Sequence, residues 1–261
     1  MSFPRLDYYA DPAGATDLVV VAHGGRQQSR QPTPEWAHAL TRMFSFVDVA
    51  VRAEPAAAVG LVRYRHRGWN EHGDALTDLL SVLDAVAEHD IRRVVLVGHS
   101  MGGRAVIGAA GHPLVAGVAA LAPWLPASDA VPDLSGRLVV VAHGDRDRIT
   151  SAAMTQRYVE RARAAGNALA MFTVAGDGHA MLRRGSDWDE LVRRTIISSL
   201  SGDVDPVIAA AASAVPGDGS EPLPKWRSGN SPVATVLRLA NSRRRLERQA
   251  IMALDGGARR V

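Results

Sequence analysis

Six short runs of mostly apolar, β-branched residues recur along the first 200 residues of this chain. They are Asp17–Ala22, Val59–Tyr64, Arg93–Gly98, Val115–Ala122, Arg137–Ala142 and Ala168–Val174. Most are separated by stretches whose apolar residues recur at helical spacing, of which Glu71–His89 is the clearest. Nearly continuous apolar strands that alternate with amphipathic helices predict an α/β fold, with a mainly parallel sheet covered by helices on both faces.

The segment between the fourth and fifth predicted strands is too short for an inserted domain. It has only 14 residues, and four of them are proline or glycine. The expected helices elsewhere are Pro34–Phe46, Glu71–His89, Gly102–Ala110, Ser151–Ala165 and Asp187–Leu200. We therefore expect a single α/β domain over residues 1–200 without an inserted cap domain.

The composition changes after residue 200. Residues 201–224 are rich in Ala, Gly, Ser, Pro and Asp, which predicts a flexible linker. Residues 225–261 form a basic C-terminal tail with nine basic and two acidic residues, in which Val233–Leu254 has the spacing of one amphipathic helix. A solvated or self-packing helix is the favoured interpretation, and contact with an acidic partner, a membrane surface or nucleic acid is the alternative.

A serine stands where the third predicted strand meets the next helix. Ser100 lies in Gly98-His99-Ser100-Met101-Gly102, which has the form G-x-S-x-G. On a tight strand-to-helix turn a serine hydroxyl is held exposed, and the two glycines let neighbouring backbone pass close. The alternative is a plain glycine-rich turn or a degenerate nucleotide loop, but no complete nucleotide-binding motif occurs. The pattern predicts that Ser100 is a nucleophile.

A serine nucleophile needs a general base, and the base needs a carboxylate to orient it. His179, in the glycine-rich loop after the last predicted strand, is the expected base. Asp147, in the loop after the fifth strand, is the expected acid, and Asp145 in the same loop is the alternative. Active-site groups of open α/β sheets lie beyond the carboxyl ends of strands, so these side chains should meet Ser100 there.

Other polar residues near these loops are expected to play structural roles. His99 lies inside the Ser100 turn and cannot face its neighbour's hydroxyl. His23 and His143 lie at strand ends and are candidates for structural partners of the site. Asp177 is too close to His179 in sequence to orient it, and an Asx-type turn is expected there.

An oxyanion hole needs two backbone N–H donors aimed at one point. Met101, after the nucleophile, should supply one, and Gly25, in the loop after the first strand, the other, with Arg26 as the alternative. Arg26, Trp124 and Leu125 are expected to line the substrate pocket. For Trp124, an ordinary core tryptophan is the alternative.

Together these motifs resemble the α/β-hydrolase superfamily. The HGG loop, the GHSMGG turn, the HGDRDRI loop and the GDGH loop follow one another in that family's order, and the resemblance covers about Asp17 to Leu200. It implies the α/β-hydrolase fold, a catalytic domain over residues 1–200, and the triad and oxyanion donors named above. The sequence departs from the family pattern in two ways. The stretch Arg63–Trp69 is unusually basic, and there is no room for the usual cap domain. In lacking a cap, the chain resembles small esterases, thioesterases and dienelactone-hydrolase-like members of the family.

These residues predict a serine hydrolase that cleaves a carboxylic ester or thioester and needs no metal or organic cofactor. Peptidase, perhydrolase or lyase chemistry, or a non-catalytic binding protein on the same fold, are the alternatives. The absence of cysteine excludes disulfides and a thiol nucleophile. No secretory signal or membrane-length apolar run is recognised, so a cytoplasmic protein is expected, with a small-molecule substrate, no nucleic-acid partner and no stable membrane insertion.

Overall fold

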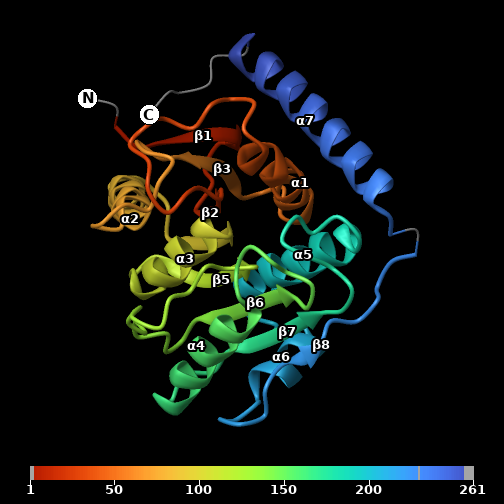
Figure 1. Ribbon diagram of the computed structural model, residues 1–261. Helices are drawn as coiled ribbons and strands as arrows, with labels where there is room; N and C mark the ends of the chain where they lie inside the picture. Colours follow the sequence, from red (N-terminus) through yellow and green to blue (C-terminus); the bar gives the residue numbers. More distant parts are fainter. Residues whose placement is uncertain (1–2, 229, 256–261) are drawn as a thin grey trace.

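The computed structural model describes residues 3–228 and 230–255, and the side chains of its last helix as far as Leu246. Within these residues eight strands form one sheet in the order β1-β3-β2-β4-β5-β6-β7-β8 (Figure 1). The strands are β1 (Arg5–Ala10), β2 (Asp17–Ala22), β3 (Ala58–Arg63), β4 (Arg93–His99), β5 (Val115–Leu121), β6 (Leu138–Gly144), β7 (Ala170–Val174) and β8 (Glu221–Pro222). All pairings are parallel except that of β1 with β3, which confirms the predicted mainly parallel sheet.

Helices cover both faces of this sheet. They are α1 (His38–Ala53), α2 (Asp74–Ala87), α3 (Met101–Gly108), α4 (Ala152–Ala164), α5 (Gly185–Ser201), α6 (Pro206–Ala212) and α7 (Pro232–Asp255). Helices α2, α3 and α4 enclose one apolar cluster against the sheet, and α1, α5 and α6 enclose another on the opposite face. The central strands are therefore buried on both sides, which explains their nearly continuous apolar sequences. No cap domain interrupts the described residues between β5 and β6.

The segment 201–224 differs from the sequence prediction. A flexible linker is expected there, whereas the structure has α6 and β8 in this segment. Asp205 caps α6 by accepting hydrogen bonds from the N–H groups of Val207 and Ile208, and Ile208 is fully buried. A short alanine-rich helix and a two-residue edge strand carry no periodicity, so composition alone gave the wrong interpretation of this segment.

Helix α7 packs along the outside of α1 (Figure 1). Leu246 is fully buried, Ser242 donates a hydrogen bond to Asp48 at 3.2 Å, and Arg245 pairs with the same carboxylate. The described part of the basic tail thus contacts the body of the protein. Residues 256–261, with Arg259 and Arg260, lie outside the described residues.

No helix in the described part of the chain is long and apolar enough to cross a membrane.

Candidate active site

Strand β4 delivers Ser100 to a sharp turn at the carboxyl edge of the sheet. The Ser100 backbone has φ 57° and ψ −117°, a positive φ that residues with side chains rarely adopt. Two glycines make the turn possible. A Cβ on Gly98 would lie 2.3 Å from the carbonyl oxygen of Gly102, and a Cβ on Gly102 would lie 2.3 Å from that of Ala22. Close backbone packing of β4, α3 and β2 therefore holds Ser100 in its strained conformation.

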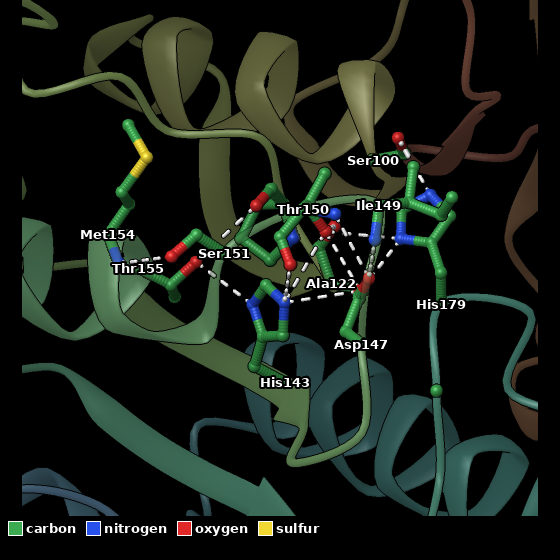
Figure 2. A network of polar contacts seen from close by, with 12 residues as sticks. Ser100, Ala122, His143, Asp147, Ile149, Thr150, Ser151, Met154, Thr155 and His179 are labelled. Atoms are coloured by element: carbon green, nitrogen blue, oxygen red, sulfur yellow. Dashed lines mark hydrogen bonds and ion pairs between the residues drawn. The ribbon is translucent and has the colours of Figure 1, made fainter.

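Three side chains from three loops meet at this edge (Figure 2). His179 Nε2 lies 3.1 Å from Ser100 Oγ, and His179 Nδ1 lies 2.8 Å from Asp147 Oδ2. The Asp147 side chain is fully buried, while that of His179 is 17% exposed. The structure thus brings the three residues of the expected triad together at hydrogen-bonding distance, with the serine at the open end.

The Asp147 carboxylate is surrounded by hydrogen-bond donors. Its Oδ1 accepts from the N–H groups of Ile149 and Thr150 at 2.8 and 3.0 Å, and its Oδ2 accepts from the Thr150 hydroxyl at 2.8 Å. Burial acts to raise the pKa of Asp147, but hydrogen bonds from His143, His179 and the two N–H groups outweigh it and hold that pKa far below its usual range. Asp147 is therefore ionised at neutral pH, as an orienting acid must be.

Asp145, the alternative acid, bonds to a different partner from Asp147. Its Oδ1 accepts a hydrogen bond from the Gly176 N–H at 2.7 Å, which ties the loop after β6 to the loop after β7. A second tie joins the Arg146 N–H to the carbonyl oxygen of Asp177 at 2.9 Å. The geometry thus places Asp147, and not Asp145, beside the candidate base.

Asp177 organises the loop that carries His179. Its buried carboxylate accepts hydrogen bonds from four N–H groups, those of Gly178, Arg183, Arg184 and the Trp188 indole. The arrangement is wider than the expected Asx-type turn, because it also reaches the first turn of α5. This carboxylate therefore fixes the path of the backbone from β7 to α5, on which the position of His179 depends.

The Asp177→Ala variant is expected to lower the free energy of unfolding by ~3–5 kcal/mol, because four buried donors lose a charged acceptor. Urea denaturation followed by circular dichroism measures this change. Asp203→Ala is the matched control, since Asp203 is exposed and its carboxylate has no hydrogen-bond partner among the described residues. Equal stabilities of the two variants would contradict the role of Asp177.

His99 supports the backbone behind His179. Its ring lies 4.6 Å from the His179 ring, and its Nε2 lies 3.0 Å from the carbonyl oxygen of His179. Burial lowers the pKa of His99 to about 3, and the charges of His179 and Arg42 act in the same direction. A carbonyl oxygen only accepts, so the neutral ring carries its proton on Nε2. His99 therefore stabilises the loop that carries His179, and the ring that contacts the Ser100 hydroxyl is that of His179.

The glycine loop after β2 lies directly against the nucleophile. A Cβ on Gly24 would be 3.3 Å from Ser100 Cβ, and a Cβ on Gly25 would be 2.4 Å from the Arg67 carbonyl oxygen and 2.5 Å from the Met101 side chain. The Gly25 N–H has no hydrogen-bond acceptor among the described residues, and the Met101 N–H begins α3, where no intrahelical acceptor exists. Both expected oxyanion donors thus flank Ser100, and their aim at one oxygen stays a prediction.

Leu125 lines a pocket of about 200 Å³ between α2, α3 and the segment after β5. Arg104 lies in the pocket wall, with its guanidinium 3.8 Å from the Trp69 ring centroid and 4.6 Å from that of Trp124. Asp129 accepts two hydrogen bonds from the same guanidinium. The Trp124 indole thus packs against the Arg104 guanidinium, and a cation–π interaction stabilises this contact.

This pocket includes one of the three residues that are expected to line the substrate pocket. Leu125 is in the lining of this pocket, but neither Trp124 nor Arg26 is, and Ser100 is not either. Arg26 is exposed and pairs through its backbone with the loop around Gly68. The loop after β2 thus bonds to the loop after β3 through the backbone of Arg26. A substrate pocket lined by Arg26, Trp124 and Leu125 stays a prediction.

Thr150 is a site residue that sequence reasoning missed. Its hydroxyl lies 2.8 Å from Asp147 Oδ2, 3.1 Å from His179 Nδ1 and 3.2 Å from the Ala122 carbonyl oxygen. The sequence indicates a site role for Thr150 only by its place three residues after Asp147, and a threonine at the end of a loop is common without such a role.

Among residues 3–228 and 230–255 no group of three His, Asp or Glu side chains is arranged to hold a metal ion.

The comparisons with known proteins agree with this fold. A family model for alpha/beta hydrolases matches residues 19–254, and the chain therefore belongs to the alpha/beta hydrolase family. A comparison with curated proteins gives no match.

Several solved structures have a similar fold. Est1E from Butyrivibrio proteoclasticus is 17% identical with a TM-score of 0.53, covering 76% of this chain and 94% of its own. A putative alpha/beta hydrolase from Agrobacterium tumefaciens is 17% identical with a TM-score of 0.58, covering 78% and 93%. The Pyrococcus furiosus esterase Pf2001 is 14% identical with a TM-score of 0.52, covering 71% and 83%. At these identities the likeness shows the shared fold.

Proposed function

We propose that this protein is a serine hydrolase that cleaves a carboxylic ester or thioester through an acyl-enzyme on Ser100. The observation that carries the proposal is the chain of contacts from Ser100 Oγ to His179 Nε2 at 3.1 Å and from His179 Nδ1 to Asp147 Oδ2 at 2.8 Å. Membership of the alpha/beta hydrolase family supports hydrolysis. Similar structures that are named esterases support an ester as the bond cleaved.

The geometry suits acyl transfer in two steps. His179 Nε2 takes the proton from Ser100 Oγ as this oxygen attacks the substrate carbonyl carbon, and ionised Asp147 stabilises the imidazolium. The N–H groups of Gly25 and Met101 then donate to the oxyanion. His179 passes its proton to the leaving alcohol or thiol. Water then attacks the acyl carbon and gives a proton to His179. His179 returns this proton to Ser100 Oγ as the bond to the acyl group breaks, which releases the acid and free Ser100.

A fluorophosphonate probe tests the proposal directly, because it reacts with a serine whose hydroxyl is activated by a base. We expect the folded wild-type protein to be labelled, and peptide mapping by mass spectrometry should find the adduct on Ser100. Heat-denatured protein is the control and should not be labelled. Folded protein that resists the probe and cleaves neither p-nitrophenyl esters nor thioesters would contradict the proposal, and would favour a binding protein on the same fold.

A further inference from the structure

A second imidazole contacts the Asp147 carboxylate on the side away from His179 (Figure 2). His143 Nε2 lies 3.2 Å from Asp147 Oδ2, the same oxygen that lies 2.8 Å from His179 Nδ1. The His143 side chain is 1% exposed, on a residue near the end of β6. One carboxylate oxygen thus has an imidazole nitrogen on either side, and the proposed mechanism uses only one of them.

The partners of His143 determine where its proton lies. Nε2 lies 3.2 Å from Asp147 Oδ2 and 3.3 Å from both the carbonyl oxygen and the hydroxyl oxygen of Thr150. The carboxylate and the carbonyl oxygen only accept, and the Thr150 hydroxyl donates its proton to Asp147 Oδ2 at 2.8 Å. Nε2 must therefore carry a proton. Nδ1 lies 2.9 Å from Thr155 Oγ1, a shorter contact than the 3.4 Å from this hydroxyl to the Pro123 carbonyl oxygen. A Thr155 hydroxyl that donates to Nδ1 leaves the ring proton on Nε2, where it faces Asp147.

The two carboxylate oxygens of Asp147 are held differently. Oδ1 accepts from two backbone N–H groups, which cannot rotate away. Apart from His179, Oδ2 accepts from the Thr150 hydroxyl and from His143. The Thr150 hydroxyl can turn to the Ala122 carbonyl oxygen at 3.2 Å, whereas the His143 N–H is fixed by its ring. The terminal torsion of an aspartate is soft, so a rigid donor on Oδ2 adds to the two N–H groups on Oδ1 in holding this oxygen in place.

From this geometry we infer that His143 is a positioning residue for the reaction at Ser100. Its Nε2–H fixes Asp147 Oδ2 where it receives the Nδ1–H of His179, and Thr155 fixes the tautomer of His143. The inference rests on the proposed function, because it assigns a role to His143 through the same triad.

Two substitutions separate positioning from packing. His143→Leu removes the donor, and His143→Gln keeps an N–H near the place of Nε2. For His143→Leu we expect kcat on a p-nitrophenyl ester to fall about 10- to 100-fold with KM changed less than about threefold, as for a misplaced catalytic group. His143→Gln should recover most of the rate. The 1H NMR signal of the proton between Asp147 and His179 should move in His143→Leu and return toward its wild-type position in His143→Gln.

Thr155→Val gives an independent test that leaves the carboxylate untouched. It removes the hydroxyl that fixes the tautomer, and kcat should fall about three- to tenfold while KM stays near the wild-type value, a partial form of the same misplacement. It also decides the outcome if His143→Leu does not fold. Rates are expressed per fluorophosphonate-reactive site, so unfolded protein does not count.

The outcomes are distinguishable. If wild-type protein reacts with the probe and hydrolyses the ester but His143→Leu or, where that variant does not fold, Thr155→Val has the wild-type kcat, the role of His143 is refuted and the proposed function stands. Equal losses in His143→Leu and His143→Gln would likewise refute it, because a packing defect does not depend on an N–H donor. Failure of the wild-type protein to react would refute the proposed function itself.

Discussion

The Ser100→Ala variant is expected to lose ester hydrolysis by a factor on the order of 10⁴ to 10⁶ in kcat, because removal of the nucleophile leaves only binding and the oxyanion donors to act. The loss should not come from unfolding. The Ser100 hydroxyl makes its hydrogen bond, among the described residues, with His179 Nε2, and alanine meets the same backbone strain at φ 57°. Steady-state kinetics on a p-nitrophenyl ester, together with thermal denaturation, measure both effects.

A matched serine provides the control for this substitution. Ser128 is exposed in the loop after β5 and has no hydrogen bond among the described residues, so Ser128→Ala should keep the wild-type rate. Fluorophosphonate labelling should disappear in Ser100→Ala and persist in Ser128→Ala. Hydrolysis by Ser100→Ala at the wild-type rate would show that another group attacks the substrate, and the triad would then have no catalytic role.

The residues at the strand ends could be predicted because local chemistry and topology act together there. A serine between glycines at a strand-to-helix junction has few structural explanations, and parallel strands bring the loops after β4, β6 and β7 to one edge. The sequence therefore indicated Ser100, Asp147 and His179 as a group, and the structure places them together. The choice of Asp147 over Asp145 depended on which carboxylate turns inward, and only the structure shows this.

Features that depend on long-range packing escaped the sequence. The edge strand β1 (Arg5–Ala10) is only partly buried and lacks the apolar run that marks the central strands. Helix α6 is held by the cap of Asp205 and the burial of Ile208, which composition does not reveal. The cation–π contact of Trp124 with Arg104 joins residues of two different segments of the chain. Contacts between segments that are far apart in the chain leave no recognisable pattern in a single sequence.

The second large effect concerns the acid of the triad. Asp147→Asn is expected to reduce kcat by a factor on the order of 10⁴. The backbone N–H groups of Ile149 and Thr150 both point at the position of Oδ1, so the asparagine oxygen must take that place. Its NH₂ group then faces His179 Nδ1 at the former position of Oδ2. A donor there favours the His179 tautomer with its proton on Nε2.

That tautomer cannot accept the proton of Ser100, because the nitrogen 3.1 Å from Oγ already carries one. The loss should therefore appear in kcat and in the rate of fluorophosphonate labelling, and not in KM. Asp145→Asn is the matched control, since an amide oxygen can still accept from the Gly176 N–H, and a change below about tenfold is expected for a surface loop contact of this kind. If Asp145→Asn instead lost the larger part of kcat, the acid of the triad would be Asp145. The geometry argues against that result, because the Asp145 carboxylate is committed to the backbone of the neighbouring loop and Asp147 lies at hydrogen-bonding distance from the imidazole.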